Sequence, residues 1–290
     1  MKVVVMYSTH AASREHVERL RQLGLEVQVV GSEPQALSEA VDADVVLGHR
    51  YLRQILPVTT RLKWVQSTAG GPEHLPLEAL RDQGVALTRN PFDSEAIAFH
   101  AVALASALLR RVGMALGECR GVPACAMVLG TGAIGGALAR LLRSIGVQRI
   151  HGVNRDGRSV DGFDAVWSSR DWRAGLGGCE LLFDCLPEGA LKLDAEAFRR
   201  LPEASRFVSV GRFENLVFED LDRALRSGQL AGAALDTEKC VLEAGSAPPN
   251  LILTPHVASH DECRGERLEA AIELQVRRFL DGTPLLGRVF

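Results

Sequence analysis

The stretch VLGTGAIGGALARLLRSIG (128–146) decides the fold expected of this chain. Its three glycines, Gly130, Gly132 and Gly135, form the pattern GxGxxG directly after an apolar run and at the start of a helical pattern. In such a unit the first glycine allows a tight turn, the second lets the backbone approach a pyrophosphate, and the third lets helix and strand pack closely. The motif predicts a dinucleotide-binding site, with a purely structural glycine turn as the alternative.

The start of the predicted helix (132–145) supplies the anion site itself. Backbone N–H groups there, including those of Ala133 and Ile134, have no partner within the helix, and the helix dipole favours negative charge. We therefore expect these residues to contact the cofactor together with the three glycines.

Strand and helix patterns alternate along the whole chain, which predicts parallel sheets covered on both faces. Five apolar strands are expected in the first part, at 2–7, 26–30, 43–48, 62–67 and 84–90. Seven more are expected later, at 124–130, 149–154, 164–169, 180–185, 206–211, 231–236 and 251–256. The result is an α/β fold with two doubly wound parallel-sheet domains. A long apolar helix (94–112) joins them, and a last helix (261–280) is expected to return to the first domain, leaving a cleft between the two.

Composition excludes several classes of function. The 290 residues are 47% hydrophobic and 24% charged with a net charge of −3, so neither a nucleic acid nor an anionic membrane is an expected partner. The apolar run at the start is too short for a signal peptide, and we expect a cytoplasmic protein. None of the six cysteines forms CxxC, so we expect reduced thiols and no metal site. His256 and His260 have metal-like spacing but lack a zincin glutamate.

The end of the next predicted strand, GVNRDGR (152–158), selects the dinucleotide. An NAD site usually has an acid there that bonds the ribose 2′-hydroxyl, but this chain has Asn154 and Arg155, with Arg158 close by. Guanidinium groups suit a 2′-phosphate, so NADP(H) is favoured over NAD(H). The alternatives are solvated loop arginines and a contribution from Asp156.

Four motifs in order resemble the D-2-hydroxyacid dehydrogenases, and most closely their glyoxylate/hydroxypyruvate reductase members. They are LKWVQSTAGGPEHL (62–75), the GxGxxG unit with GVQRIHGVNR (146–155), FVSVGRFENLVFEDLDRAL (207–225) and LILTPHVAS (251–259). The resemblance implies a flavodoxin-like substrate-binding domain (1–93 plus 262–290) and a Rossmann dinucleotide-binding domain (94–261). It also implies a possible homodimer and a small 2-oxo or 2-hydroxy acid as substrate.

The resemblance also implies roles for particular residues. Arg212 would hold the carboxylate and carbonyl of a 2-oxo acid, and His256 would act as general acid/base. Asp236 would meet the nicotinamide carboxamide. The backbone of three residues would cradle the substrate carboxylate: Ala69, Gly70 and Gly71. Each has a plain alternative as a surface or packing residue, and Trp64 is expected to be a packing residue.

One family feature is missing. The glutamate that pairs with the histidine should lie five residues after Asp236, where this chain has Val241. Glu238 and Glu243 flank that position, and Glu243 is the better candidate for the partner of His256. The change leaves two other hypotheses open: a reductase of an imine or a specialised acid, and a non-catalytic dinucleotide-binding protein.

Overall fold

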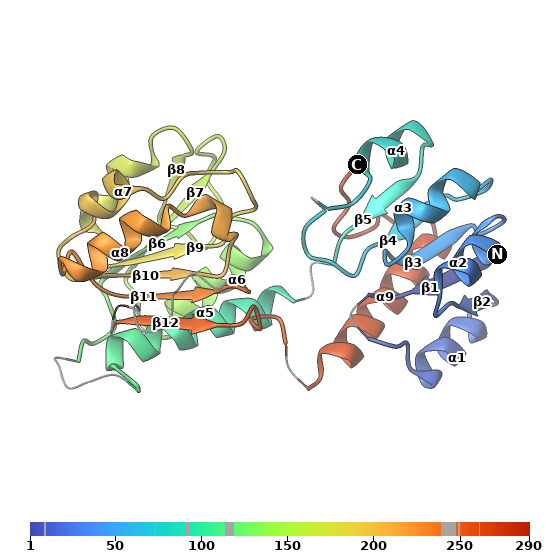
Figure 1. Ribbon diagram of the computed structural model, residues 1–290, viewed down its shortest axis with the longest axis horizontal. Helices are drawn as coiled ribbons and strands as arrows, with labels where there is room; N and C mark the ends of the chain where they lie inside the picture. The colour runs from blue at the N-terminus through green and yellow to red at the C-terminus, as the bar shows by residue number, and fades with distance from the viewer. Residues whose placement is uncertain are drawn as a thin grey trace. The chain divides into compact units, whose positions relative to one another are not determined.

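The computed structural model describes residues 1–8, 10–72, 74–90, 93–113, 119–238, 248, 250–260 and 262–290. The chain divides into two compact units, Met1–Asp93 with Asp261–Phe290, and Ser94–His260 (Figure 1). The boundary predicted near residue 261 differs from this division by one position. Each unit contains one parallel sheet, so the predicted α/β class is confirmed.

The first unit is built on a five-stranded parallel sheet with the order β2-β1-β3-β4-β5. This is the flavodoxin-like order, in which the chain winds outward in both directions from the first strand. Each predicted strand of this unit is present, and the bounds are β1 (Lys2–Met6), β2 (Glu26–Val29), β3 (Val45–Gly48), β4 (Trp64–Gln66) and β5 (Ala86–Thr88).

Helices cover both faces of this sheet, as continuous apolar strands require. The residues that pack on one face come from α2 (Glu33–Ala40), α3 (Leu52–Ile55), η1 (Leu56–Val58) and α4 (Leu77–Asp82). Those on the other face come from α1 (Arg14–Gln22) and from α9 (Arg264–Leu280), which follows the whole second unit in the sequence. The predicted return of the last helix to the first unit is therefore confirmed.

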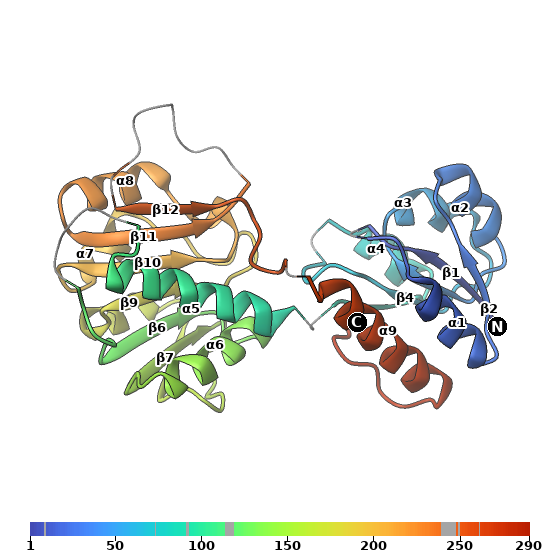
Figure 2. The same ribbon diagram turned by 90° about the horizontal axis from the view of Figure 1, so that it is seen from below.

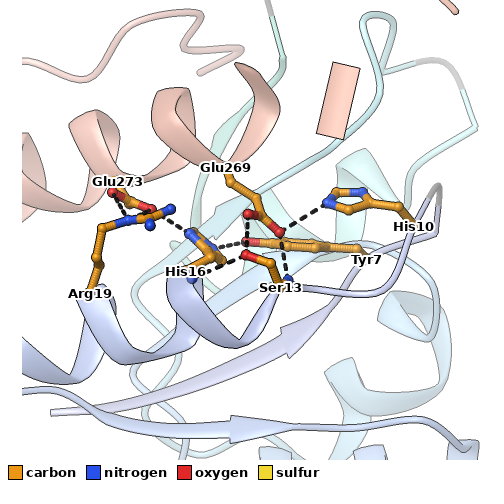
Figure 3. A network of polar contacts seen from close by, with 7 residues as sticks. All are labelled: Tyr7, His10, Ser13, His16, Arg19, Glu269 and Glu273. Carbon is orange, nitrogen blue, oxygen red and sulfur yellow. Dashed lines mark hydrogen bonds and ion pairs between the residues drawn. The ribbon is translucent and has the colours of Figure 1, made fainter. Parts of the chain in front are cut away.

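A network of buried polar contacts joins α9 to α1 (Figure 3). The Glu269 carboxylate accepts hydrogen bonds from the Ser13 N–H at 2.7 Å and the Ser13 hydroxyl at 2.6 Å. His16, fully buried, lies between the Tyr7 hydroxyl at 2.7 Å and Glu273 at 2.6 Å. Burial alone would raise the pKa of Glu269. The two hydrogen bonds from Ser13, together with the charge interaction with His16, outweigh burial and lower this pKa below the usual value. The packing of α9 against α1 therefore combines these polar contacts with apolar ones.

The second unit is a seven-stranded parallel sheet with the order β12-β11-β10-β9-β6-β7-β8, a Rossmann order with one added strand at the β12 edge. Its bounds are β6 (Cys125–Leu129), β7 (Arg149–Asn154), β8 (Ala165–Ser168), β9 (Leu181–Asp184), β10 (Ser205–Ser209), β11 (Leu230–Asp236) and β12 (Leu251–Thr254). Two predicted strands of this unit, 206–211 and 251–256, end two residues early, at Ser209 and Thr254. A Cβ at Gly211 would lie 2.6 Å from the Asp184 carboxylate, so the chain just beyond β10 has no room for a side chain there.

Two layers of helices enclose this sheet (Figure 2). One layer is α5 (Ser94–Arg110) with α6 (Ala133–Ser144). The other layer is η2 (Trp172–Gly178), α7 (Ala195–Arg200) and α8 (Phe218–Arg226), and a short η3 (Phe213–Asn215) follows β10. The central strands β6, β9, β10 and β11 are buried on both faces, which explains why their sequences are continuously apolar. No helix among the described residues is long and apolar enough to span a bilayer.

Candidate active site

The glycine loop between β6 and α6 meets all three requirements of a pyrophosphate site. Gly130 has a φ of +99°, a conformation that favours glycine. A Cβ on Gly135 would lie 1.8 Å from the Gly130 carbonyl oxygen, so helix and turn are in direct backbone contact. Gly132, the residue that caps α6, has no heavy atom within 4 Å of its Cβ position. The loop is therefore closely packed where Gly135 meets Gly130 and open at Gly132, where a phosphate can approach the backbone.

Asn154, at the end of β7, organises the loop that follows it. Its side-chain oxygen accepts hydrogen bonds from the backbone N–H groups of Asp156 and Arg158, both at 3.2 Å. Its amide donates to the Thr131 hydroxyl in the glycine loop at 3.3 Å. These bonds hold the loop close to the glycine turn and leave Arg155 and Arg158 with exposed side chains. Asn154 thus acts on the neighbouring backbone, while the two guanidinium groups remain available to an anion.

Arg212 follows β10 at the same edge of the sheet. The backbone passes over Asp184, because the Val210 N–H donates to the Asp184 carbonyl at 3.0 Å. The Arg212 side chain is half-buried and, within the described ranges, forms no ion pair with a carboxylate. A half-buried guanidinium that forms no ion pair within the described ranges is a suitable receptor for an external carboxylate.

Asp184, at the end of β9, is a buried acid that the sequence patterns did not single out. Its carboxylate accepts hydrogen bonds from the Leu186 N–H at 3.0 Å and the Ser209 hydroxyl at 2.9 Å. Burial raises its pKa from 3.8 to about 6, although those hydrogen bonds and the charge of Arg212 act in the opposite direction. A single acid closing the apolar run ELLFD is the sequence feature that could have identified it.

Asp236 holds the loop that carries His256. Its carboxylate accepts three hydrogen bonds, from the Thr254 hydroxyl at 2.6 Å and from the N–H groups of Val257 and Ala258, both at 2.9 Å. The resemblance assigns Asp236 to the nicotinamide carboxamide. In the described structure the carboxylate accepts hydrogen bonds from this loop, and its contact with the carboxamide stays a prediction. Asp236 is therefore well placed to fix the backbone on both sides of His256.

His256 has an unusual backbone conformation, with a φ of 54°. Left-handed backbone is uncommon outside glycine and tends to occur at functional sites. Its side chain is exposed, and no carboxylate in the described part of the chain forms an ion pair with it. Glu238 is exposed, and both Val241 and Glu243 lie outside the described residues.

His100, on α5, contacts the strand end that precedes the same loop, and local sequence patterns do not indicate it. Its Nε2 lies 3.1 Å from the Thr254 hydroxyl and 3.8 Å from the Asp236 carboxylate. It is a polar residue in the alanine-rich helix that covers β10 and β11, which is the only sequence feature that could have indicated it.

The predicted substrate loop lies in the first unit, after β4. The Ala69 N–H already donates to the Ser67 hydroxyl at 3.0 Å. The N–H groups of Gly70 and Gly71 form no hydrogen bond in the described structure, so these two remain able to bind a carboxylate. Trp64 is fully buried and donates to the Thr88 hydroxyl at 2.8 Å, as expected of a packing residue.

A polar cluster that local sequence patterns do not indicate lies beside this loop. The ring of His49, directly after β3, lies 3.2 Å from the Ser8 hydroxyl and 3.1 Å from the Ser67 hydroxyl. Burial lowers its pKa to about 4, with a contribution from His74, so the ring is neutral at neutral pH. The residues come from the ends of three neighbouring strands, a proximity that the sequence alone does not reveal.

These features define a class of protein. In open α/β sheets, ligands bind at the carboxyl ends of the strands. The glycine loop, Arg212, Asp236 and His256 all follow strands of the second unit at that edge, so the unit is a dinucleotide-binding domain with a basic and an imidazole group at the same edge.

Comparison with known proteins supplies the family. Residues 123–258 match the NAD binding domain of the D-isomer specific 2-hydroxyacid dehydrogenases. Glyoxylate/hydroxypyruvate reductase A of Serratia proteamaculans is 30% identical over 139 residues, which span 46% of this chain and 44% of that protein. A putative 2-hydroxyacid dehydrogenase of Haemophilus influenzae is 23% identical over 89% of this chain and 91% of its own length.

A solved structure matches both units together. The NADPH-dependent glyoxylate/hydroxypyruvate reductase of Sinorhizobium meliloti, in complex with NADP and sulfate, is 25% identical, with a TM-score of 0.78 over 99% of this chain and 98% of that one. Residues 123–258, in the second unit, are therefore an NAD(P)-binding domain of the type found in the D-isomer specific 2-hydroxyacid dehydrogenases, and the chain spans less than half the length of the Serratia relative that it matches.

Proposed function

We propose that this chain is an NADP(H)-dependent reductase that converts a small 2-oxo acid into the D-2-hydroxy acid. The observation that carries the proposal is that Arg212, His256 and the glycine loop follow β10, β12 and β6 at one edge of one parallel sheet. The matched family segment contains all of them. A solved relative with both units in common holds NADP.

The proposed chemistry assigns one task to each group. The bound dinucleotide supplies a hydride to the carbonyl carbon. Arg212 binds the carboxylate and the carbonyl oxygen, where negative charge develops. His256 delivers a ring proton to that oxygen. The free N–H groups of Gly70 and Gly71 are proposed to hold the carboxylate as well.

Turnover tests these assignments directly. NADPH oxidation should be followed with glyoxylate, hydroxypyruvate and a panel of larger 2-oxo acids. Arg212→Ala should lower kcat/KM by about 1,000-fold, the usual loss when a group that stabilises the developing oxyanion is removed. Arg170→Ala, which removes an exposed arginine in the turn after β8, is the matched control. Equal activity of the Arg212 and Arg170 variants would refute the role of Arg212.

The preference for NADP(H) rests on the two exposed arginines of the loop after β7. Arg155→Ser with Arg158→Ser should raise the Kd of NADPH by about 100-fold or more, because each lost charge-assisted hydrogen bond is worth about 1.5–3 kcal/mol. The Kd of NADH should hardly change. A selective loss of NADH binding in Asp156→Asn, with NADPH binding unchanged in the double variant, would favour NAD(H) instead.

The partner of His256 is also a proposal. Glu243 is assigned this role, with Glu238 as the alternative. Glu243→Gln should lower kcat and displace the basic limb of its pH profile, and Glu238→Gln should do neither. If both variants behave as wild type while Val241→Glu gains activity, the enzyme works without a carboxylate beside His256.

A second candidate function follows from the absence of a described acid beside His256. An imine is protonated more readily than a ketone, so a reductase of imines would depend less on that acid. Mixtures of a 2-oxo acid with ammonia or an amine would then support turnover when the oxo acid alone does not. NADPH binding without turnover on any substrate would instead indicate a binding protein.

A further inference from the structure

Three metal-ligand side chains converge near the amino-terminal ends of three neighbouring strands of the second unit. Cys125 is the first residue of β6, His151 lies in β7, and Cys179 comes two residues before β9. The sheet order β9-β6-β7 makes these strands neighbours (Figure 1). The ligand atoms of the three side chains all lie within 4.8 Å of one another. This edge is opposite to the one with the glycine loop.

The sulfurs are too close for simple apolar packing. The Sγ atoms of Cys125 and Cys179 are 3.1 Å apart and share a hydrogen bond, whereas apolar atoms pack at about 3.5–4.0 Å. Cys179 Sγ lies 3.7 Å from His151 Nδ1. Both cysteines are buried, at 1% and 0% exposure. The lone pairs of three good donors are therefore directed into one small volume.

These separations are near those of a tetrahedral thiolate–imidazole site. Zn–S distances of about 2.3 Å and Zn–N distances of about 2.0–2.1 Å place neighbouring ligand atoms about 3.5–3.8 Å apart. The distance of 3.7 Å between Cys179 Sγ and His151 Nδ1 already fits. The histidine donor and Cys125 Sγ lie within 4.8 Å, and the two sulfurs need to separate by about 0.7 Å. Two thiolates also neutralise a divalent cation, which removes much of the penalty for burying its charge. His151 is half-buried, which leaves a route for water to a fourth position.

We propose that Cys125, His151 and Cys179 form a binding site for one thiophilic metal ion of the Zn²⁺ class. The ion would link β6, β7 and the end of η2, and it would take no part in hydride transfer. A disulfide between the two cysteines would use the sulfurs but would leave the position of His151 unexplained. A metal ion uses all three donors, so the geometry favours it.

The test is a metal titration of the intact chain. The protein is reduced, treated with a chelator and titrated with Co²⁺ alone, and Zn²⁺ is then added. One equivalent of Co²⁺ should produce thiolate charge-transfer and intense tetrahedral d–d absorption, and Zn²⁺ should abolish both. Zn²⁺ should also raise the Tm of the wild-type protein.

Variants locate the site. Cys125→Ser, His151→Gln and Cys179→Ser should each weaken Zn²⁺ binding at least 100-fold, as loss of one of three protein ligands requires, and should remove the rise in Tm. Cys119→Ser and Cys263→Ser replace exposed cysteines and should bind as wild type. His151→Gln leaves both buried thiols in place, so it remains informative if a cysteine variant fails to fold. NADPH binding provides a check of folding in every variant.

Several outcomes would overturn the proposal. These are no cobalt absorption, Zn²⁺ binding that His151→Gln leaves unchanged, or binding that Cys119→Ser or Cys263→Ser weakens as much. Another is a Cys125–Cys179 disulfide that forms with hydrogen peroxide in a protein whose reduced form takes up no metal. In that reaction both thiols are oxidised, one S–S bond forms and the peroxide is reduced to water, so the pair would be a redox pair.

Discussion

The two edges of the seven-stranded sheet differ in how their polar groups are arranged. At the carboxyl edge, Arg155, Arg158, Arg212 and His256 expose their side chains at least in part, and Asp184 and Asp236 support the turns beneath them. At the amino edge, Cys125 and Cys179 are buried and contact each other, and Cys179 also contacts His151. The first edge thus exposes the side chains proposed to bind a large ligand from solvent, whereas the second gathers three donor atoms within 4.8 Å of one another.

This difference follows from the geometry of parallel sheets. Loops after the strands carry residues that need not pack, and the helix that begins after β6 directs free N–H groups outward. Residues at the starts of the strands are held between helices. Single substitutions at the carboxyl edge should therefore change cofactor binding or turnover without unfolding the protein. Substitutions at the amino edge should change metal binding and leave turnover unchanged.

The strongest test concerns the glycine loop. Gly135→Ala should abolish NADPH binding and destabilise the unit by about 3 kcal/mol or more, since the new methyl group overlaps a backbone oxygen that cannot move away. Gly132→Ala should keep the stability and raise the Kd of NADPH about 10-fold to 100-fold. Gly136→Ala, whose nearest atom is 3.9 Å away, is the control and should bind normally. Chemical unfolding and NADPH titration measure both quantities. Normal binding by Gly132→Ala would exclude this loop as the pyrophosphate site.

The next test concerns Asp236, whose carboxylate accepts three hydrogen bonds from the His256 loop. Asp236→Asn can replace only part of them, so kcat should fall about 10-fold to 100-fold while the Kd of NADPH changes less than about 3-fold. Thr254→Val removes one of the bonds and should have a smaller effect. A large rise in the Kd of NADPH with kcat retained would show that Asp236 serves the carboxamide instead.

Asp184 provides a test by pH. Its folded-state pKa of about 6 exceeds the ordinary value of 3.8, so the folded protein binds more protons between these values. Its contribution to stability is present below pH 4 and is lost as the pH rises through 6. Asp184→Asn should remove a slope worth about 2–3 kcal/mol from the free energy of unfolding between these pH values. Asp161→Asn, in an exposed turn, should leave the slope in place, and a slope unchanged in Asp184→Asn would contradict the burial argument.

The smallest effect is expected at the amino edge. Cys125→Ser and Cys179→Ser should change kcat and the Kd of NADPH by less than about 2-fold, because both residues lie at the far end of their strands from the glycine loop. Steady-state kinetics with and without added Zn²⁺ measure this. If either substitution changed turnover 10-fold, the two edges would not be independent.

The comparison also explains what could be predicted from the sequence. Buried parallel strands are continuously apolar, so each strand was visible as a short run, and GxGxxG located the cofactor loop because its spacing is local. The end of β10 differs from the prediction because VSVG (208–211) continues the apolar pattern beyond Ser209, where the strand ends.

Local sequence patterns cannot predict contacts between residues that are distant in the sequence. Cys125 and Cys179 are far apart in the sequence, and no CxxC spacing marks them. His100 and Thr254 meet because α5 packs across β10 and β11. The NADP(H) preference and the roles of Arg212 and His256 are predictions, since they depend on contacts with the cofactor and the substrate.

The return of α9 to the first unit has a consequence for the order of events during synthesis. One face of the five-stranded sheet, including Val3, Val5 and Trp64, is covered by Leu268, Ile272 and Val276 of that helix. The ribosome makes residues 94–260 before it makes the helix, so the second unit can fold as soon as it emerges, whereas the first must wait with an apolar face uncovered. The sheet made before the second unit is thus completed after it, once α9 has been synthesised.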